Sequence, residues 1–180
     1  MDDDAQRAAG PPDEGHDADP TAVARAIVLR ALTASPRSRA ELAARLARRR
    51  VPPETADAVL DRFEELGLVD DAAYADTVIR VQQAGRGLGR RALSAELARR
   101  GVPADLARQA LEQVDDDAER RAAARLVAKR LPSLAGQPRA VAARRLAGML
   151  ARKGYASGLI RTVVGEALHG RDEPVGETGE

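Results

Sequence analysis

The stretch "SAELARRGV" at residues 94–102 is typical of the end of a helix, and two related stretches occur elsewhere in the chain. "AARLARRRV" occupies residues 43–51, and "AGMLARKGY" occupies residues 147–155. Each contains a leucine, an alanine, at least two cations and then a residue that ends the helix. Such recurrence indicates either a structural module copied along the chain or a copied contact surface.

Capping and breaking residues divide the chain into nine predicted helices. Asp19 and Pro20 supply an N-cap and a first-turn proline, and Ser38 with Glu41 forms a capping box. Glycines and Pro132 end several of the later helices. The expected helices cover about residues 20–34, 38–50, 53–66, 70–84, 89–100, 103–114, 115–131, 139–153 and 157–169.

The helices fall into three groups of three. Alignment of the three stretches superposes leucine pairs at offsets of 51 and 53 residues, namely Leu42 and Leu46, Leu93 and Leu97, and Leu146 and Leu150. We therefore predict an all-α protein, an elongated and curved array of three tandem three-helix repeats at residues 19–68, 69–115 and 116–169. Because each module buries little surface, neighbouring modules are expected to support one another.

The helix-ending position differs among the copies. Gly101 and Gly154 can adopt the left-handed conformation that ends a helix. Arg50 occupies the equivalent place in the first copy, where that conformation costs roughly 1 kcal/mol. Pro52 and Pro53 offer another way to restrict the turn, so we expect the first module to have a different exit angle.

Composition limits the chemistry that the chain can perform. Aromatic residues make up only 2% of the chain, so the core must consist of leucine, valine, isoleucine and alanine. The absence of cysteine excludes disulfides and thiolate chemistry and fits a reducing compartment. The first residues are acidic where a secretory signal is basic, and no apolar run approaches the roughly 18 residues that span a bilayer. We expect a cytoplasmic protein.

The formal net charge of +1 conceals a segregation of charge along the chain. Residues 1–20 carry −6 and residues 171–180 carry −3, which leaves 27 Lys and Arg against 17 Asp and Glu between them. Residues 1–18 and 170–180 are expected to be disordered acidic tails. The basic body suggests an anionic partner, either nucleic acid or an acidic protein groove. A GC-rich coding bias that makes arginine the default surface residue is the alternative.

The positions of the arginines on the helices favour a binding surface. On a helical wheel of about 100° per residue, Leu93 and Leu97 mark the buried stripe, and Arg91 and Arg99 lie opposite it. Equivalent positions and the adjacent "GRGLGRR" segment complete the candidate binding set, which comprises Arg48, Arg86, Arg90, Arg91, Arg99, Arg144, Arg145 and Arg152.

Three further cations lie beside the buried stripe. Arg49, Arg100 and Lys153 occupy equivalent positions in the last turn of their helices. Cations in a last turn complement the helix dipole by about 0.3 to 1 kcal/mol, so we expect these three to have a structural role.

Catalytic features are lacking in the sequence. His16 lies in the expected acidic tail and His169 at the end of the last helix, so neither is placed as a general base. The segment "GRGLG" lacks the end of a phosphate-binding loop, and "VDDDAE" at residues 114–119 is better explained as a helix cap than as a metal site. We expect a protein that is not an enzyme and that has no cofactor and no metal.

Sequence-specific recognition of nucleic acid is also disfavoured. The helices on either side of residues 50–53 resemble a helix-turn-helix, but the second of them carries Asp57, Asp61 and Glu64, which repel phosphates. Single-strand binders stack bases on aromatic side chains, and this chain has almost none. Any affinity for DNA is therefore expected to be weak and electrostatic.

Three segments together resemble a known family. "SRAELAARL" at residues 38–46, "LGLVDDAAYA" at residues 66–75 and "GRGLGRRALSAELARRGV" at residues 85–102 closely resemble the RecX family of recombinase regulators. The likeness covers roughly residues 20–168, and the third module is matched mainly by "RRLAGMLARKGY" at residues 144–155. Arg50, where the family usually has glycine, and the acidic N-terminal extension depart from the family pattern.

The resemblance implies a fold and a function. RecX proteins are all-helical and consist of tandem three-helix repeats in a curved body. The resemblance implies binding in the groove of the RecA filament on single-stranded DNA, with restraint of strand exchange, ATP hydrolysis and coprotease activity. This places the chain in DNA repair, homologous recombination and the SOS response, and we expect a monomer that does not bind membranes. A sequence-nonspecific DNA-binding protein and a helical adaptor that contacts only protein remain the alternatives.

Overall fold

The computed structural model describes residues 19–169, which form nine α-helices and one short 3₁₀-helix. The elements are α1 (Pro20–Ala34), α2 (Arg39–Arg48), α3 (Pro53–Glu65), α4 (Asp71–Arg86), α5 (Arg90–Arg99), α6 (Ala104–Glu112), α7 (Asp116–Arg130), η1 (Leu131–Leu134), α8 (Arg139–Arg152) and α9 (Ser157–His169). The predicted acidic tails at residues 1–18 and 170–180 lie outside the described residues.

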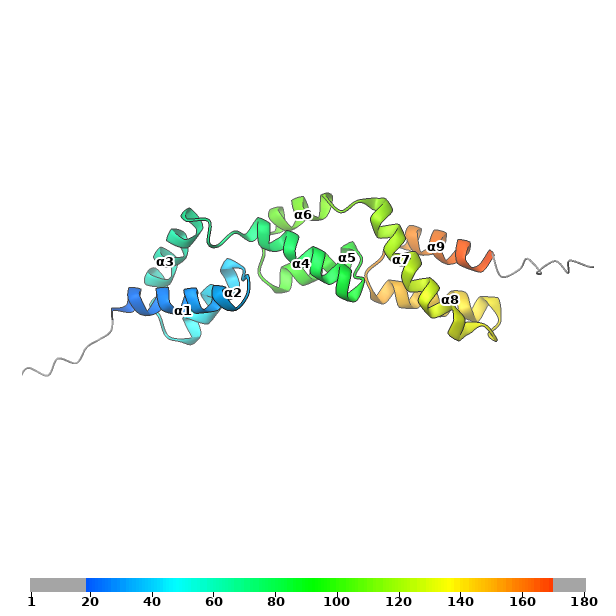
Figure 1. The fold of residues 1–180 in the computed structure, drawn as a ribbon, viewed down its shortest axis with the longest axis horizontal. Coiled ribbons are helices and arrows are strands. Elements are labelled where there is room, and N and C mark those ends of the chain that lie inside the picture. Colours follow the sequence, from blue (N-terminus) through cyan, green and yellow to red (C-terminus); the bar gives the residue numbers. More distant parts are fainter. Residues whose placement is uncertain (1–18, 170–180) are drawn as a thin grey trace, which may run out of the picture.

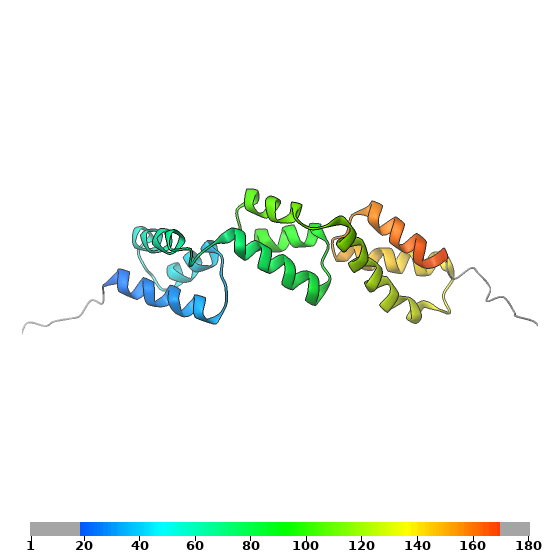
Figure 2. The same cartoon turned by 45° about the horizontal axis from the view of Figure 1, so that its top comes forward.

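The helices are arranged as three units in a gently arched row (Figures 1 and 2). Helices α1–α3 form the first repeat, α4–α6 the second and α7–α9 the third, and helix packing lies mainly within each repeat. The first and last described helices lie at opposite ends of the row (Figure 1). The predicted all-α array of tandem three-helix repeats is confirmed.

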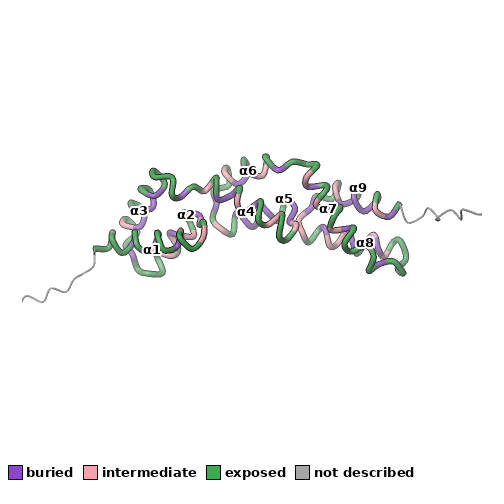
Figure 3. Tube along the Cα trace, in the orientation of Figure 1, coloured by how far each residue is buried: buried purple, intermediate pink, exposed green. Residues whose placement is uncertain are grey.

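Each repeat has an apolar core of its own, and buried positions alternate with exposed ones along every helix (Figure 3). The six leucines that the sequence alignment superposed are at most 1% exposed. One aromatic side chain is buried in each repeat, namely Phe63, Tyr74 and Tyr155. The mutual support expected between modules therefore comes from contacts at the junctions between repeats and not from a shared core.

Local signals account for most helix ends, with two exceptions. Helix α7 ends at Arg130, and Pro132, the predicted end, lies within the 3₁₀-helix η1, which was not predicted. The capping box at Ser38 is only half formed: its Oγ accepts from the Glu41 backbone N–H at 3.1 Å, but the Glu41 carboxylate accepts from the Tyr74 hydroxyl at 3.0 Å. The Glu41 carboxylate thus binds Tyr74 of the second repeat instead of the backbone N–H of Ser38, which a full capping box requires.

The three second helices end in the same way. Arg50, Gly101 and Gly154 have φ values of 59°, 72° and 85°, so all three are left-handed. In each case the following residue donates its backbone N–H to a carbonyl five positions back, as Val51 does to Leu46 at 3.2 Å. Arg50 adopts the left-handed turn despite its side chain, so Pro52 and Pro53 do not impose a different turn there. The different exit angle of the first module stays a prediction.

The second helices α2, α5 and α8 meet end to end at the two junctions between repeats. The hydroxyl of Ser38, at the start of α2, donates to the carbonyl of Arg100, at the end of α5. At the equivalent place the Gly89 backbone N–H, before α5, donates to the Lys153 carbonyl, after α8, at 2.8 Å. Each helix start thus faces a helix end, which brings opposite ends of the helix dipoles together.

Candidate partner-binding surface

The second helices carry most of the arginines that the sequence placed on the outer face. Arg48, Arg99 and Arg152 occupy the same position in the last turn of α2, α5 and α8, and all three are exposed. Arg91 and Arg144 are equivalent residues earlier in α5 and α8 and are also exposed, as is Arg145 beside them. The folded chain therefore presents these predicted residues to solvent.

Arg90 differs from the other residues of the predicted set. Its guanidinium lies 2.6 Å from the Asp116 carboxylate and 3.6 Å from that of Glu119, and it donates to the Val114 carbonyl. Its backbone N–H donates to Glu119 at 2.9 Å. Arg90 thus joins the second repeat to the third, so its charge is balanced within the chain.

The "GRGLG" segment, a predicted part of the binding surface, forms the junction with the third repeat. The Tyr155 hydroxyl donates to the Gly87 carbonyl at 3.1 Å, and the Lys153 ammonium donates to the Arg86 carbonyl. An added Cβ at Gly89 would lie 2.9 Å from the backbone of Gly154. The glycines allow close approach of two repeats, while the Arg86 side chain remains exposed.

A polar cluster joins the first repeat to the second. Arg100 pairs with the buried Glu96 at 2.8 Å, donates to the Tyr74 hydroxyl at 2.8 Å and lies 3.7 Å from the Glu41 carboxylate. Arg99 pairs with Glu96 from the outside. Burial raises the pKa of Tyr74, as does its hydrogen bond to Glu41, while Arg100 acts in the opposite direction.

The structural role predicted for the cations beside the buried stripe is confirmed for two of them. Arg100 and Lys153 are half-buried, and each contacts the preceding repeat: Arg100 lies 3.7 Å from the Glu41 carboxylate, and Lys153 donates to the Arg86 carbonyl. Arg49, the third member, is exposed at the end of α2, where no preceding repeat lies among the described residues.

Arg39 is a structural arginine that the sequence analysis missed. From the start of α2 it reaches α3, where its guanidinium lies 2.7 Å from Asp61 and 2.7 Å from Glu64, with Asp57 at 3.8 Å. Burial lowers the pKa of Arg39, but its hydrogen bond to Asp61 and the charge of Glu64 outweigh burial and raise it. The acidic face of α3 is therefore partly neutralised from within the first repeat, by one arginine against three carboxylates.

Positive charge is concentrated in the third repeat. Residues 116–169 contain eleven Lys and Arg against four Asp and Glu, whereas residues 69–115 contain seven of each. A cavity of about 630 Å³ on α8 is lined by Arg144, Arg145, Gly148, Met149 and Arg152, together with Arg130 from the end of α7. Arg130 was not predicted, because only the folded chain brings the end of α7 beside α8.

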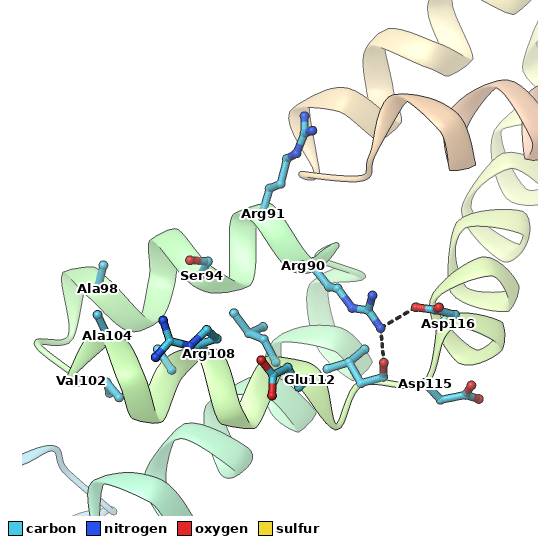
Figure 4. A pocket seen from close by; sticks show the side chains of 13 residues that line it. Arg90, Arg91, Ser94, Ala98, Val102, Ala104, Arg108, Glu112, Asp115 and Asp116 are labelled. Atoms are coloured by element: carbon cyan, nitrogen blue, oxygen red, sulfur yellow. Dashed lines mark hydrogen bonds and ion pairs between the residues drawn. The ribbon is translucent and has the colours of Figure 1, made fainter.

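Two grooves separate the second and third helices of the later repeats. The second-repeat groove lies between α5 and α6 and has a volume of about 840 Å³ (Figure 4). Arg108 lies within it between the two helices, while Arg91 projects from its rim away from the floor (Figure 4). The third-repeat groove, of about 400 Å³, lies between α8 and α9 and is lined by Arg144 and Arg161.

The acidic run before α7 acts as a helix cap. The Asp115 carboxylate accepts from the backbone N–H groups of Asp117 and Ala118, each at 3.1 Å, as the sequence predicted. Within residues 19–169, no helix is both long enough and apolar enough to cross a membrane.

Comparison with known proteins gives consistent matches over the three repeats. Models of the first, second and third three-helix domains of RecX match residues 24–63, 70–111 and 117–164. The chain is 50% identical over 145 residues to the regulatory protein RecX of Thermobifida fusca, covering 81% of this chain and 78% of the relative. It is 46% identical over 162 residues to that of Streptomyces coelicolor, covering 90% and 86%.

Solved structures show the same fold. The crystal structure of RecX from Lactobacillus salivarius superposes with a TM-score of 0.78 at 19% identity, covering 83% of this chain and 97% of that one. A second crystal structure of a regulatory protein RecX gives a TM-score of 0.74 at 23% identity, covering 81% of this chain and 73% of that one.

Proposed function

Because this chain belongs to the RecX family of regulatory proteins, we propose that it modulates the RecA recombinase by binding in the groove of the RecA filament on single-stranded DNA. Bound there, the chain restrains strand exchange, ATP hydrolysis and coprotease activity without catalysing a reaction of its own. Copies of one contact along the chain meet successive subunits of the polymer, and linked weak contacts gain avidity.

The recurrence of exposed arginines on the second helices is the observation that carries this proposal. Arg48, Arg99 and Arg152 occupy one helical position, and Arg91 and Arg144 occupy another. Arginine binds carboxylates and phosphates through two parallel hydrogen bonds, so these side chains suit an anionic polymer surface. Within the set, Arg99 is already paired with Glu96, which leaves Arg48, Arg91, Arg144 and Arg152; the last three lie on the second and third repeats and serve as test positions.

A triple charge reversal tests the proposal. The variant with Arg91→Glu, Arg144→Glu and Arg152→Glu replaces three attractive contacts with repulsive ones. We expect the concentration that gives half-inhibition of single-stranded-DNA-dependent RecA ATP hydrolysis to rise about tenfold or more. Far-ultraviolet circular dichroism should be unchanged, because the three side chains are exposed.

The matched control reverses three exposed arginines on first helices, Arg25, Arg30 and Arg80. It has the same net charge as the test variant and should inhibit like the unaltered chain. If the test variant inhibits RecA as well as the unaltered chain does, the second helices do not form the contact. If the unaltered chain itself neither binds the filament nor inhibits RecA, the proposed function fails.

The charge of the third repeat favours a second candidate function, which is nonspecific binding of DNA without a recombinase. The cavity lined by Arg130, Arg144, Arg145 and Arg152 is suited to phosphate oxygens. A DNA-binding protein of this kind would bind bare single or double strands with a steep dependence on salt. Binding to bare DNA and to assembled RecA filament, measured at two salt concentrations, separates this function from the first and from an adaptor without DNA affinity.

A further inference from the structure

The second-repeat and third-repeat grooves are copies of one another. Eight of the nine residues that line the third-repeat groove lie 53 positions after residues that line the second-repeat groove. The equivalent pairs include Arg91 and Arg144 on the rims, Ser94 and Ala147, and Arg108 and Arg161 on the third helices. The two arginine pairs are identical in the two grooves, whereas Glu112 and Asp115 are replaced by Gly165 and Leu168. The shared arginines indicate one kind of ligand for both grooves.

Each groove combines an apolar floor with two arginines that have no acidic partner among the described residues. Ala107 and Leu111 face the first groove, and Ile160 and Val164 occupy their places in the second. Among residues 19–169, none of the four arginines named above forms an ion pair. A ligand that fits both features carries an apolar side chain next to a negative charge.

The first repeat shows what satisfies such a site. The equivalents of Arg91 and Arg108 there are Ala40 and Asp57, 51 positions earlier. Arg39 of α2 crosses to the carboxylates of α3, so guanidinium and carboxylate are already paired between the second and third helices. In the other two repeats the third helix carries Arg108 or Arg161 in place of Asp57, and neither forms an ion pair within residues 19–169, so each is available to a carboxylate of another molecule.

The lining of the second-repeat groove favours a protein ligand over nucleic acid. Glu112, Asp115 and Asp116 lie toward one end of the groove, so they would repel a continuous run of phosphates along it, whereas a ligand with a single carboxylate at Arg108 can leave that end to its uncharged part (Figure 4). No aromatic side chain lines either groove, so bases have nothing to stack on.

We propose that these two grooves are equivalent docking sites for two copies of one acidic segment of a protein partner. Each copy places an apolar side chain on the floor and a carboxylate at Arg108 or Arg161. Two grooves in tandem suit neighbouring subunits of a polymer, so the proposal deepens the proposed function and rests on it for the identity of the partner.

The experiment fills both grooves without changing charge. Ser94→Trp with Ala147→Trp places bulk at equivalent groove positions, and the control, Ala95→Trp with Ala124→Trp, places it at exposed positions outside both linings. The probe is a fluorescent helical peptide with leucine and glutamate along one face, and its counterpart has lysine in place of glutamate. Fluorescence anisotropy with the full chain measures both affinities, and circular dichroism verifies folding.

We expect the glutamate peptide to bind at least about tenfold more tightly than the lysine peptide, and the groove-filling variant to lose about tenfold in that affinity. The control variant should bind like the unaltered chain. Equal affinity for both peptides, or unchanged peptide binding by the groove-filling variant, would overturn the proposal. It would also be overturned if filling the grooves abolished binding of an oligothymidylate but not of the glutamate peptide, since the grooves would then take nucleic acid.

RecA inhibition, measured on the same variants, separates this proposal from the proposed function. Inhibition by the unaltered chain and the groove-filling variant at equal concentrations leaves the proposed function intact and removes the grooves as RecA contacts. Absence of inhibition by the unaltered chain removes the proposed function, while the peptide affinities still decide what the grooves bind.

Discussion

Two separate demands act on the left-handed residues that follow the second helices. All three residues must have a positive φ, and two of them must also lack a Cβ because the neighbouring repeat lies against them. An added Cβ at Gly101 would overlap that of Ala40, and one at Gly154 would overlap Ala92. Arg50 is exposed at the end of the array, so only the first demand applies to it.

Substitutions at these positions are therefore expected to have opposite effects. Gly101→Ala should destabilise the chain by about 1–3 kcal/mol, because it adds a strained φ and a steric overlap with the first repeat. Arg50→Gly should leave the chain equally stable or stabilise it by up to about 1 kcal/mol, because it only relieves strain. Urea denaturation followed by circular dichroism measures both, and equal effects of the two substitutions would contradict this interpretation.

Helix ends, more than helix faces, join the repeats to one another. The N-terminus of α2 receives the end of α5, and the N-terminus of α5 receives the end of α8. At each junction a carboxylate also accepts the first backbone N–H of the helix, from Arg39 to Asp71 at 2.8 Å and from Arg90 to Glu119 at 2.9 Å. Negative charge at a helix N-terminus is stabilising. The dipoles of α2 and α5 therefore strengthen the contacts of these carboxylates at the two junctions.

Each junction also contains a tyrosine, which makes its stability depend on pH. Burial raises the pKa of Tyr74, and burial with the charge of Glu119 raises that of Tyr155. An unfolded tyrosine ionises near pH 10, so above about that pH the unfolded chain has lost a proton that the folded chain still holds. The free energy of unfolding should therefore fall as the pH rises above about 10.

Removal of the two hydroxyls tests this dependence. Urea denaturation of the unaltered chain and of the variant with Tyr74→Phe and Tyr155→Phe, measured from neutral pH to strongly alkaline pH, compares the two declines. The double variant should be less stable at neutral pH, because Arg100 and Gly87 each lose a hydrogen-bond partner. Its further decline at high pH should be smaller, and identical declines would show that other groups control the alkaline transition.

At the scale of the whole molecule, the chain is a row of separate cores connected through small contacts. The buried apolar residues form three clusters, one in each repeat, and none of the clusters spans a junction. In arrays of this kind the free energy of unfolding is approximately the sum of the stability of each repeat and the stability of each interface between neighbouring repeats. The arrangement leaves the outer faces of the second helices and the two grooves open along the length of the molecule.

Local damage should therefore remain largely local. Leu97→Ala removes a fully buried side chain from the second core and should cost that repeat about 2–5 kcal/mol. Amide hydrogen exchange should accelerate most in residues 71–112 and least in α1, whose buried residues belong to the separate core of the first repeat. Equal acceleration throughout residues 19–169 would instead show that the row unfolds as a single cooperative unit.

Capping residues, helical periodicity and repetition of short segments were enough to predict nine helices, three repeats and the outward positions of Arg91, Arg99, Arg144 and Arg152. These features depend on residues within a few turns of one another, whose geometry follows from the sequence itself. The partners of Arg39, Arg90 and Arg100, the position of Arg130 and the two arginine-lined grooves depend on segments that are distant in the chain. Only the packing of the helices brings those segments together and decides which arginines are balanced internally and which are available to a partner.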